Sequence, residues 1–323
     1  RLKRFTTRRP LRRISREMAR RVAVICEHVF GAGLAQCLVP AAVSASALHR
    51  GCHDSSTLGL DITVDDDGIA TLRLANDRAR NPLSRDLLLR LKGVLRECAA
   101  MDMTTFGSAA AAPVRCLVIA STGPVFSSGH DMRDFTAEVS AEDQLATLGL
   151  CAEVNMLLSS VPQPTIALVD GHAMAGGCQL AASCDLLLCT RSSTFSLPGV
   201  RSKEGFCHTP AVAVAAKVGR RALRLSLLGD DVTAQEAKEL GLVDVIGDMD
   251  SLRETIATLA KRFDNQMAIG KQTFYEYSRG AVLEHMYRAA TPVMATLMRN
   301  SSEGFTKFLA GKRRSGVTRR GQA

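Results

Sequence analysis

Apolar residues between positions 58 and 190 recur with two alternating periods, which predict strands and helices in turn. Two β-rich runs, 58–64 and 69–74, flank an acidic turn sequence that ends in Gly68, and this pattern predicts a hairpin. A helix is predicted over 83–98, where Ser84 can cap the first turn. The alternation favours βαβ units, in which helices cover a parallel sheet, and so an α/β fold. The other predicted strands are 115–120, 165–169 and 186–190, and the other helices are 141–160 and 176–184.

The C-terminal part of the chain has a mostly helical pattern from Thr209 onward, and no internal repeat is visible. We therefore predict a core at 51–250 and a helical C-terminal region with a basic tail at 251–323. Residues 99–113 form a low-complexity insert, which we expect on the surface. The helices predicted in this part are 220–228, 234–240, 251–263 and 282–299.

The formal net charge of +9 is concentrated in residues 1–50, which hold 11 Lys and Arg but only two acidic residues. Residues 51–323 hold 30 of each and are therefore neutral. An Arg-rich, acid-poor leader is typical of an organelle transit peptide, and we predict import into the mitochondrial matrix. Two alternatives are a basic arm that binds RNA or anionic lipid and a membrane anchor at 22–48. The apolar run of that anchor is interrupted by Glu27 and Pro40.

The composition argues against a metal site and against nucleic-acid binding by the core. The ten cysteines form no CxxC pair, and several stand in apolar runs, which predicts buried, reduced thiols and no metal site. Tryptophan is absent and aromatic residues make up only 4% of the chain, so we expect no nucleic-acid partner for the core. We also expect no cofactor and no membrane span.

Two glycine-bearing turns, 127–131 and 173–177, each follow an apolar strand. The second turn leads into a helix at Gly176, where N–H groups lack intrahelical acceptors and the helix dipole is positive. Glycine lets a reactive oxygen approach the backbone closely. We therefore predict that the two turns grip one carbonyl oxygen with two N–H donors, as an oxyanion hole does.

Five segments, in order along the chain, carry a family resemblance. They are 81–84 (Asn-Pro-Leu-Ser), 125–132 (Val-Phe-Ser-Ser-Gly-His-Asp-Met), 173–185, 229–243 and 303–313. With these segments, residues 58–314 resemble the crotonase (enoyl-CoA hydratase/isomerase) superfamily. The resemblance implies a spiral of ββα units with a helical C-terminal trimerisation region, assembled as homotrimers or dimers of trimers. It also implies an acyl-CoA thioester as ligand, within fatty-acid metabolism.

The resemblance further implies roles for particular residues. The backbone N–H groups of His130 and Gly176 would form the oxyanion hole. Residues 130–133 would line the acyl-CoA path, and the loop at 80–82 would lie near the adenine end. A CoA phosphate would be met from the terminal helix of the same or a neighbouring subunit. The substrate-binding residues implied are Arg80, Asn81, Ser128, Gly129, Asp131, Met132, Arg133, Lys312 and Arg313.

The chain departs from the family at the two positions that carry hydratase chemistry. Hydratases have one glutamate at the position of Gln179 and a second at that of Gly199, so both are replaced here. Addition of water needs one carboxylate to activate the water and another to protonate carbon, whereas an amide does not titrate. Loss of each group costs roughly two to four decades in rate. We therefore expect weak or absent hydratase turnover.

A few other side chains are candidates to replace the two glutamates. Glu204 is a candidate base, but the alternative of a solvated loop beside Arg201 and Lys203 is favoured. Cys207 and His208 are neighbours in a segment expected to be extended, so their side chains should point apart. For three further residues we expect a structural role or a role of the backbone alone. Asp131 is expected to cap a turn, His130 to act through its backbone, and His172 to be a strand-end residue with no apparent partner.

Two functions of the core remain open on the sequence, and RNA binding through the basic leader is a third, weaker option. In the first, the chain is an enoyl-CoA hydratase/isomerase-like enzyme with altered chemistry, in which Gln179 orients a water or the substrate. In the second, it is a non-catalytic acyl-CoA-binding regulator of mitochondrial lipid metabolism that keeps the thioester cradle without the acids.

Overall fold

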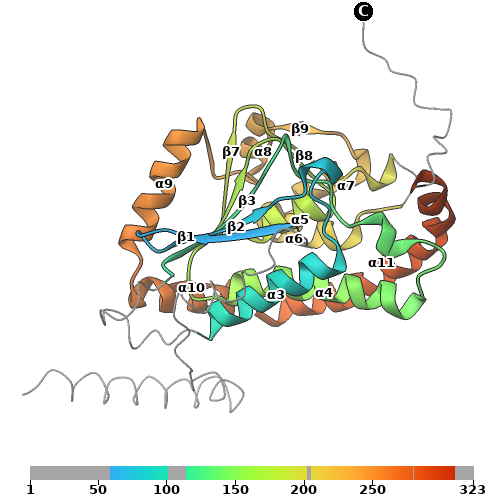
Figure 1. The fold of residues 1–323 in the computed structure, drawn as a ribbon, viewed down its shortest axis with the longest axis horizontal. Coiled ribbons are helices and arrows are strands. Elements are labelled where there is room, and N and C mark those ends of the chain that lie inside the picture. The colour runs from blue at the N-terminus through green and yellow to red at the C-terminus, as the bar shows by residue number, and fades with distance from the viewer. Residues whose placement is uncertain (1–58, 101–113, 202–204, 279, 310–323) are drawn as a thin grey trace, which may run out of the picture. The chain divides into compact units, whose positions relative to one another are not determined.

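The computed structural model describes residues 59–100, 114–201, 205–278 and 280–309 of the chain. Within these residues the strands form two sheets (Figure 1). The larger sheet has six strands in the order β1-β2-β3-β5-β7-β10, and the smaller has four in the order β4-β6-β8-β9. The strand bounds are β1 Leu60–Val64, β2 Ile69–Leu74, β3 Cys116–Ser121, β4 Val125–Ser127, β5 Thr165–Val169, β6 His172–Met174, β7 Leu186–Thr190, β8 Thr194–Ser196, β9 Val232–Thr233 and β10 Val245–Gly247.

The helices follow a repeated path relative to the sheets. The chain passes through one strand of each sheet and then a helix, in the order β3, β4, α4, then β5, β6, α5, then β7, β8, α6. This path is a spiral of ββα units, as the resemblance implies. The helix bounds are α3 Arg85–Ala99, α4 Ala141–Ser160, α5 Gly176–Ser183, α6 His208–Val218, α7 Ala222–Leu228, α8 Ala234–Leu240, α9 Met249–Arg262, α10 Asn265–Ser278 and α11 Gly280–Leu309.

The larger sheet is mostly parallel and is buried on both faces. Along β3, Leu117 and Ile119 join the main core, while Cys116 and Val118 point to the opposite face. Helix α9 covers that second face with Leu252, Ile256 and Ala260. Burial of both faces explains why β3, β5 and β7 are continuous apolar runs without polar alternation.

Most predicted elements of the core are confirmed. Strands β1 and β2 pair antiparallel, with Leu60 opposite Leu74, as the hairpin pattern predicts. The Ser84 hydroxyl accepts the N–H of Leu87 and caps α3. Three-residue strands β4, β6 and β8, and helix α10, were not predicted. Helix α11 extends beyond the predicted 282–299 at both ends, to Gly280–Leu309, and contains an internal proline, Pro292.

Helices α10 and α11 lie against α4. Helix α11 contacts α4, α6 and the short 3-10 helix η5 (Met132–Phe135), and Figure 1 shows it running along α4. No helix within the described ranges is long and apolar enough to cross a membrane. The predicted leader, the candidate anchor at 22–48 and residues 101–113 of the insert lie outside the described residues.

Candidate functional site

The two glycine-bearing turns, far apart in sequence, meet in the structure. The first turn follows β4, and the second joins β6 to α5. A Cβ atom at Gly129 would lie 2.9 Å from the backbone nitrogen of Gly176 and 3.0 Å from the Cβ of Ala175. Gly129 also has a positive φ of 93°, a conformation that favours glycine. The contact between the turns therefore depends on the absence of a side chain at Gly129.

A second glycine brings α5 against β4. A Cβ atom at Gly177 would collide with the carbonyl oxygen of Ser127 and lie 2.7 Å from the Ser127 Cβ. A helix start can approach a strand this closely only without a side chain at the contact. Gly177 thus sets the spacing between the N-terminus of α5 and the end of β4.

Backbone pairing directs the N–H of His130 away from its neighbouring strand. The Leu83 N–H donates to the Gly129 carbonyl (2.8 Å), and the Asp131 N–H donates to the Leu83 carbonyl (3.3 Å). In a parallel pairing, the residue between these two bonds points its own N–H to the other side. Gly176 is the first residue of α5, so its N–H has no intrahelical acceptor. Two adjacent turns thus each offer one backbone donor.

The residue before Gly176 has a strained backbone. Ala175 has φ 47° and ψ −118°, outside the regions that L-residues readily adopt, and its N–H donates to the Ser196 carbonyl (2.9 Å). Such strain costs about 1–3 kcal/mol and persists only where the surroundings impose it. The surroundings therefore hold the start of α5 in a particular orientation.

The imidazole of His130 also lies at this junction. Its Nδ1 and Cε1 are 3.2 Å from the position that a Cβ of Gly176 would take, and its ring meets Phe135 edge-on at 5.7 Å. Nε2 is buried and has no hydrogen-bond partner among the described residues. Burial lowers the pKa of His130 to about 4, because it disfavours the charged form. The ring is therefore neutral at physiological pH.

Gln179 lies one helical turn after Gly176, on the same face of α5. Its side chain is fully buried. The Gln179 Nε2 donates to the Tyr287 hydroxyl (3.4 Å), and its Oε1 accepts from the Thr209 hydroxyl (3.4 Å). Both bonds are long, but together they fix the orientation of the amide. Sequence reasoning did not identify Thr209 or Tyr287 as a site residue, because each stands in a helical stretch far from Gln179 in the chain.

Gly199, where the family resemblance implies a second glutamate in hydratases, leaves no room for a side chain. A Cβ atom there would collide with the carbonyl oxygen of Gly205 and lie 2.8 Å from the Sγ of Cys207. The backbone itself thus occupies the space that a glutamate would need. Glu204, the candidate replacement base, lies outside the described residues, as do Lys312 and Arg313.

The loop at 80–82 supports the first turn. The Arg80 carbonyl accepts the Ser128 N–H (3.0 Å). The Asn81 amide nitrogen donates to the carbonyls of Thr122 (2.8 Å) and Val125 (2.7 Å), and its Oδ1 accepts the Asn76 N–H (2.7 Å). Asn81 is buried, so its side chain joins loops together and is not exposed to a ligand.

Asp131 caps η5, as expected, by accepting the Arg133 N–H (3.0 Å). Burial raises the pKa of Asp131, but hydrogen bonds and the charge of Arg133 outweigh that effect and lower it. The exposed guanidinium of Arg133 is thus already paired with Asp131. Met132 is partly buried and packs against the apolar cluster around Phe135.

Two expectations about histidines are wrong. His172 has a partner, because its Nδ1 lies 2.6 Å from the Thr194 hydroxyl across β6 and β8. Cys207 and His208 do not lie in an extended segment, since Cys207 is the N-cap of α6 and His208 its first residue. The His208 ring lies 5.0 Å from that of Phe206.

The described cysteines are buried, as predicted, and the structure contains no cluster of metal-ligating side chains within the described ranges. Burial is the largest cause that raises the thiol pKa to about 12, which keeps these thiols protonated and unreactive. The thiols with this shift are those of Cys98, Cys116, Cys151, Cys178, Cys184 and Cys189.

The fold and the paired turns define the class of the protein. Residues 65–315 match the model of the enoyl-CoA hydratase/isomerase family, so the chain belongs to this family. It is similar to the rat mitochondrial enoyl-CoA hydratase domain-containing protein 3, with 33% identity, over 79% of this chain and 83% of the relative. The human protein of that name is also 33% identical, over 75% of this chain and 78% of the relative.

Solved structures agree with this assignment. The crystal structure of human enoyl-CoA hydratase domain-containing protein 3 has a TM-score of 0.60 and 31% identity, over 79% of this chain and 98% of that one. An enoyl-CoA hydratase from Mycobacterium smegmatis has a TM-score of 0.62 and 32% identity, over 80% and 99%. The fold is therefore the crotonase fold, and the family resemblance predicted from the sequence is confirmed.

Proposed function

We propose that this protein binds acyl-CoA thioesters and polarises the thioester carbonyl with the N–H groups of His130 and Gly176. The observation that carries the proposal is the contact between the two turns, where a Cβ at Gly129 would lie 2.9 Å from the Gly176 nitrogen. Only this proximity allows donors from both turns to reach one oxygen. Family membership supports the same ligand class.

The chemistry at this cradle differs from ordinary hydration. Gln179 offers an amide that does not titrate, and Gly199 has no space for a carboxylate. We propose an altered hydratase/isomerase-like reaction in which the cradle stabilises a thioester enolate and Gln179 orients the substrate or a water. The proposal includes no resident cofactor, metal or nucleic-acid partner. In this proposal residues 130–133 line the acyl-CoA path, and Lys312 and Arg313 meet a CoA phosphate.

The second candidate function is non-catalytic binding of acyl-CoA in the regulation of lipid metabolism. The observation that favours it is the closed position at Gly199, because a carboxylate there is excluded by backbone and not merely replaced. The hydration of crotonyl-CoA separates the ordinary reaction from both candidates. A rate near that of ordinary hydratases would show that Gln179 is compatible with hydration after all.

Calorimetry tests binding with three ligands. They are CoA, a medium-chain acyl-CoA, and an analogue in which two CH2 groups replace the carbonyl group and the sulfur of the thioester. We expect the thioester to bind more tightly than the analogue, because only the thioester has an oxygen for the two N–H donors. Absence of binding by the folded protein would overturn both candidate functions. Equal binding of thioester and analogue would overturn the oxyanion hole alone.

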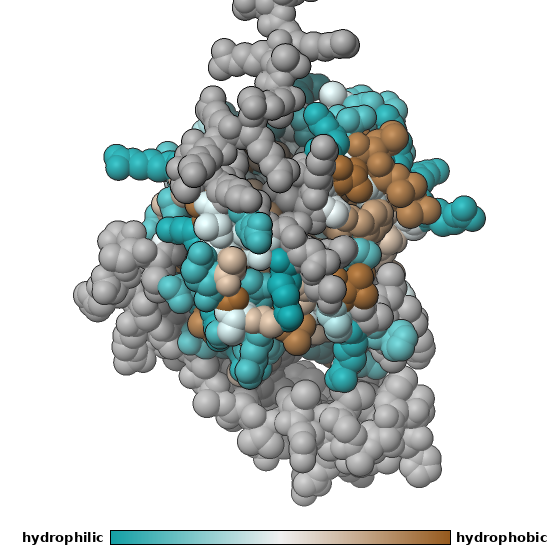
Figure 2. Space-filling model, turned by 90° about the vertical axis from the view of Figure 1, so that its right-hand side faces the viewer, coloured by the Kyte–Doolittle hydropathy of each residue, from teal (hydrophilic) through white to brown (hydrophobic). Residues whose placement is uncertain are grey.

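The family resemblance implies a homo-oligomer, and we propose that the chain assembles as homotrimers or dimers of trimers. Leucines on α7 support an interface, since Leu223, Leu227 and Leu228 are 46%, 63% and 55% exposed. Figure 2 shows apolar side chains gathered in a few groups on an otherwise hydrophilic face. Light scattering of the full chain tests this proposal. A monomer at micromolar concentration would contradict it.

We further propose that the protein acts in the mitochondrial matrix, with residues 1–50 as its import signal. The relatives from rat and human are both named mitochondrial. The mass of the protein recovered from isolated mitochondria gives the test. Loss of an Arg-rich N-terminal segment is expected, and its retention would count against the transit peptide.

A further inference from the structure

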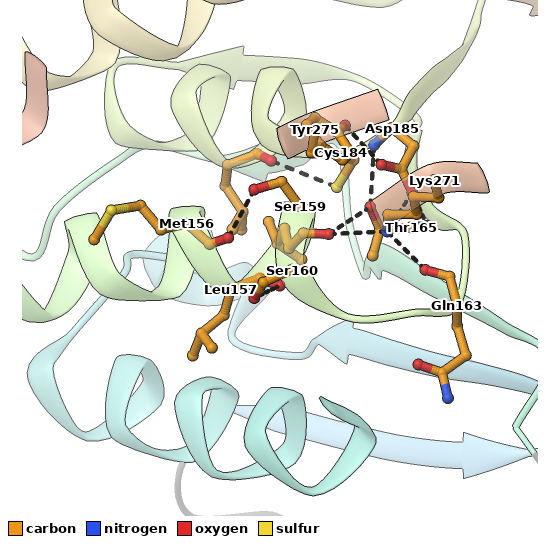
Figure 3. Close-up of polar contacts among 12 residues, drawn as sticks. Met156, Leu157, Ser159, Ser160, Gln163, Thr165, Cys184, Asp185, Lys271 and Tyr275 are labelled. Atoms are coloured by element: carbon orange, nitrogen blue, oxygen red, sulfur yellow. Dashed lines mark hydrogen bonds and ion pairs between the residues drawn. The ribbon is translucent and has the colours of Figure 1, made fainter. Parts of the chain in front are cut away.

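A buried carboxylate lies just beyond the C-terminal end of α5, the helix that begins with Gly176 (Figure 3). Asp185 Oδ2 accepts the backbone N–H of Thr165 (2.6 Å), and Oδ1 accepts the hydroxyl of Tyr275 (2.7 Å). The Asp185 N–H in turn donates to the Thr165 hydroxyl (3.0 Å). Both carboxylate oxygens are therefore engaged, one by β5 and the other by α10.

Lys271 of α10 completes this cluster. Its ammonium lies 2.7 Å from Asp185 Oδ2 and donates to the carbonyls of Leu158 (3.2 Å) and Gln163 (2.7 Å). Three acceptors thus match the three N–H bonds of the ammonium. The side chains of Lys271 and Asp185 are only 10% and 17% exposed. Because its hydrogen-bonding groups all have partners, this ion pair fixes the relative positions of α4, α5 and α10.

The Gly177 contact at the other end of α5 limits the helix in one direction only, because a steric contact with Ser127 does not prevent the helix from withdrawing. The Ala175 N–H also holds the preceding turn to the Ser196 carbonyl (2.9 Å). The strained backbone of Ala175 persists only where its surroundings impose it, so the geometry of this turn depends on a firm attachment of α5. An eight-residue helix is about 12 Å long and behaves as a short rigid rod. An attachment at its C-terminal end is therefore transmitted to Gly176.

We propose that Lys271 and Tyr275 are positioning residues for the oxyanion hole, because they hold α5 through Asp185 and so keep the Gly176 N–H in place. The inference rests on the proposed function of that N–H. Neither residue touches the site, and their effect passes along the helix. A purely structural pair would instead contribute stability and leave the carbonyl-polarising geometry unchanged.

The chain offers a matched control in Lys217 of α6. Its side chain is also 10% exposed, and its ammonium lies 2.9 Å from Asp244 Oδ2. Asp244 also accepts a strand N–H, that of Leu187 (2.7 Å), as Asp185 accepts that of Thr165. The two lysines are equally exposed, but the Asp244 carboxylate is more exposed than that of Asp185 (32% against 17%), and among the described residues Lys217 donates to Asp244 and to no backbone carbonyl. Lys217→Met should therefore lower the melting temperature less than Lys271→Met, and both variants are compared at a temperature at which each is folded.

The readout is the absorption maximum of 4-dimethylaminocinnamoyl-CoA bound at saturation to the full chain. This push–pull thioester absorbs at longer wavelength when hydrogen bonds polarise its carbonyl, so the red shift reports the oxyanion hole independently of affinity. We expect Lys271→Met to lose about half of the red shift or more, and Lys217→Met to retain it. Tyr275→Phe, which lacks only the hydroxyl bonded to Asp185, should lose a smaller part.

Each outcome decides between the alternatives. A full red shift in Lys271→Met at saturation would make the pair structural and overturn the positioning role. If Lys271→Met does not fold, Tyr275→Phe decides, and an unchanged maximum in that variant overturns the proposal. Binding to the wild-type protein without any red shift would instead overturn the proposed oxyanion hole, and with it the premise of the inference.

Discussion

The side-chain amide of Gln179 donates a hydrogen bond to the hydroxyl of Tyr287, which lies 108 residues later in the chain (3.4 Å). The bond brings α11 to the helix that begins at Gly176. Thr209, from α6, contacts the other end of the same amide. The Gln179 amide is therefore oriented by two helices, α6 and α11, that the local sequence around Gln179 does not contain.

The double variant Tyr287→Phe/Thr209→Val tests whether these hydroxyls orient Gln179. It leaves a buried amide without two of its partners, and we expect a loss of about 1–3 kcal/mol in the free energy of unfolding. Urea unfolding measures this loss, and acyl-CoA affinity should fall with it. Ser226→Ala is the control, since its buried hydroxyl bonds a carbonyl within α7. An unchanged affinity in the double variant would separate Gln179 from the ligand site.

Glutamates introduced at positions 179 and 199 should not produce a hydratase. We expect Gly199→Glu to destabilise the fold by about 1–3 kcal/mol or more, because its Cβ would collide with the Gly205 carbonyl. Gly93→Glu, which places its Cβ where no atom lies within 4 Å, is the matched control. Crotonyl-CoA hydration by Gln179→Glu and by the double variant with Gly199→Glu completes the test. Hydratase-like turnover in a stable double variant would refute the steric argument.

Gly129→Ala should abolish tight thioester binding. The new methyl group would lie 2.9 Å from the Gly176 nitrogen, at a φ of 93° that L-residues rarely adopt, so the two turns must separate. Calorimetry with the thioester and its carbonyl-free analogue should show that the preference for the thioester is lost. Gly149→Ala in α4 introduces the same methyl group with no atom within 4 Å and should bind as the wild type does.

His130 should make the protein sensitive to mild acid. Its pKa falls from 6.5 to about 4 on burial, so between these values the unfolded chain binds a proton that the folded protein does not. Stability contributed by the neutral ring is therefore lost as pH falls from about 6.5 to 4, by about 3 kcal/mol. Urea unfolding across this range should show a shallower decline for His130→Gln than for the wild type.

Elements that depend on local pattern were predicted closely. The bounds of α4 and β5 agree with those expected, and Ser84 caps α3 through a bond to a residue three positions away. Periodicity and capping act within one or two turns of chain, so the sequence shows them directly. Strands β4, β6 and β8 have three residues each and are stabilised by pairing with distant strands. Such short runs have no periodic signal of their own.

The sequence by itself determined the family, the alternation of strands and helices in the core and the two turns that carry glycine, because each depends on residues close together in the chain. Only the tertiary structure decided how those turns meet, that Gly199 has no space for a side chain, and that Gln179 is held by Tyr287. It also decided that Lys271 reaches Asp185 at the far end of α5. These relationships depend on packing between segments many tens of residues apart, and packing at that range leaves no periodic trace in one sequence.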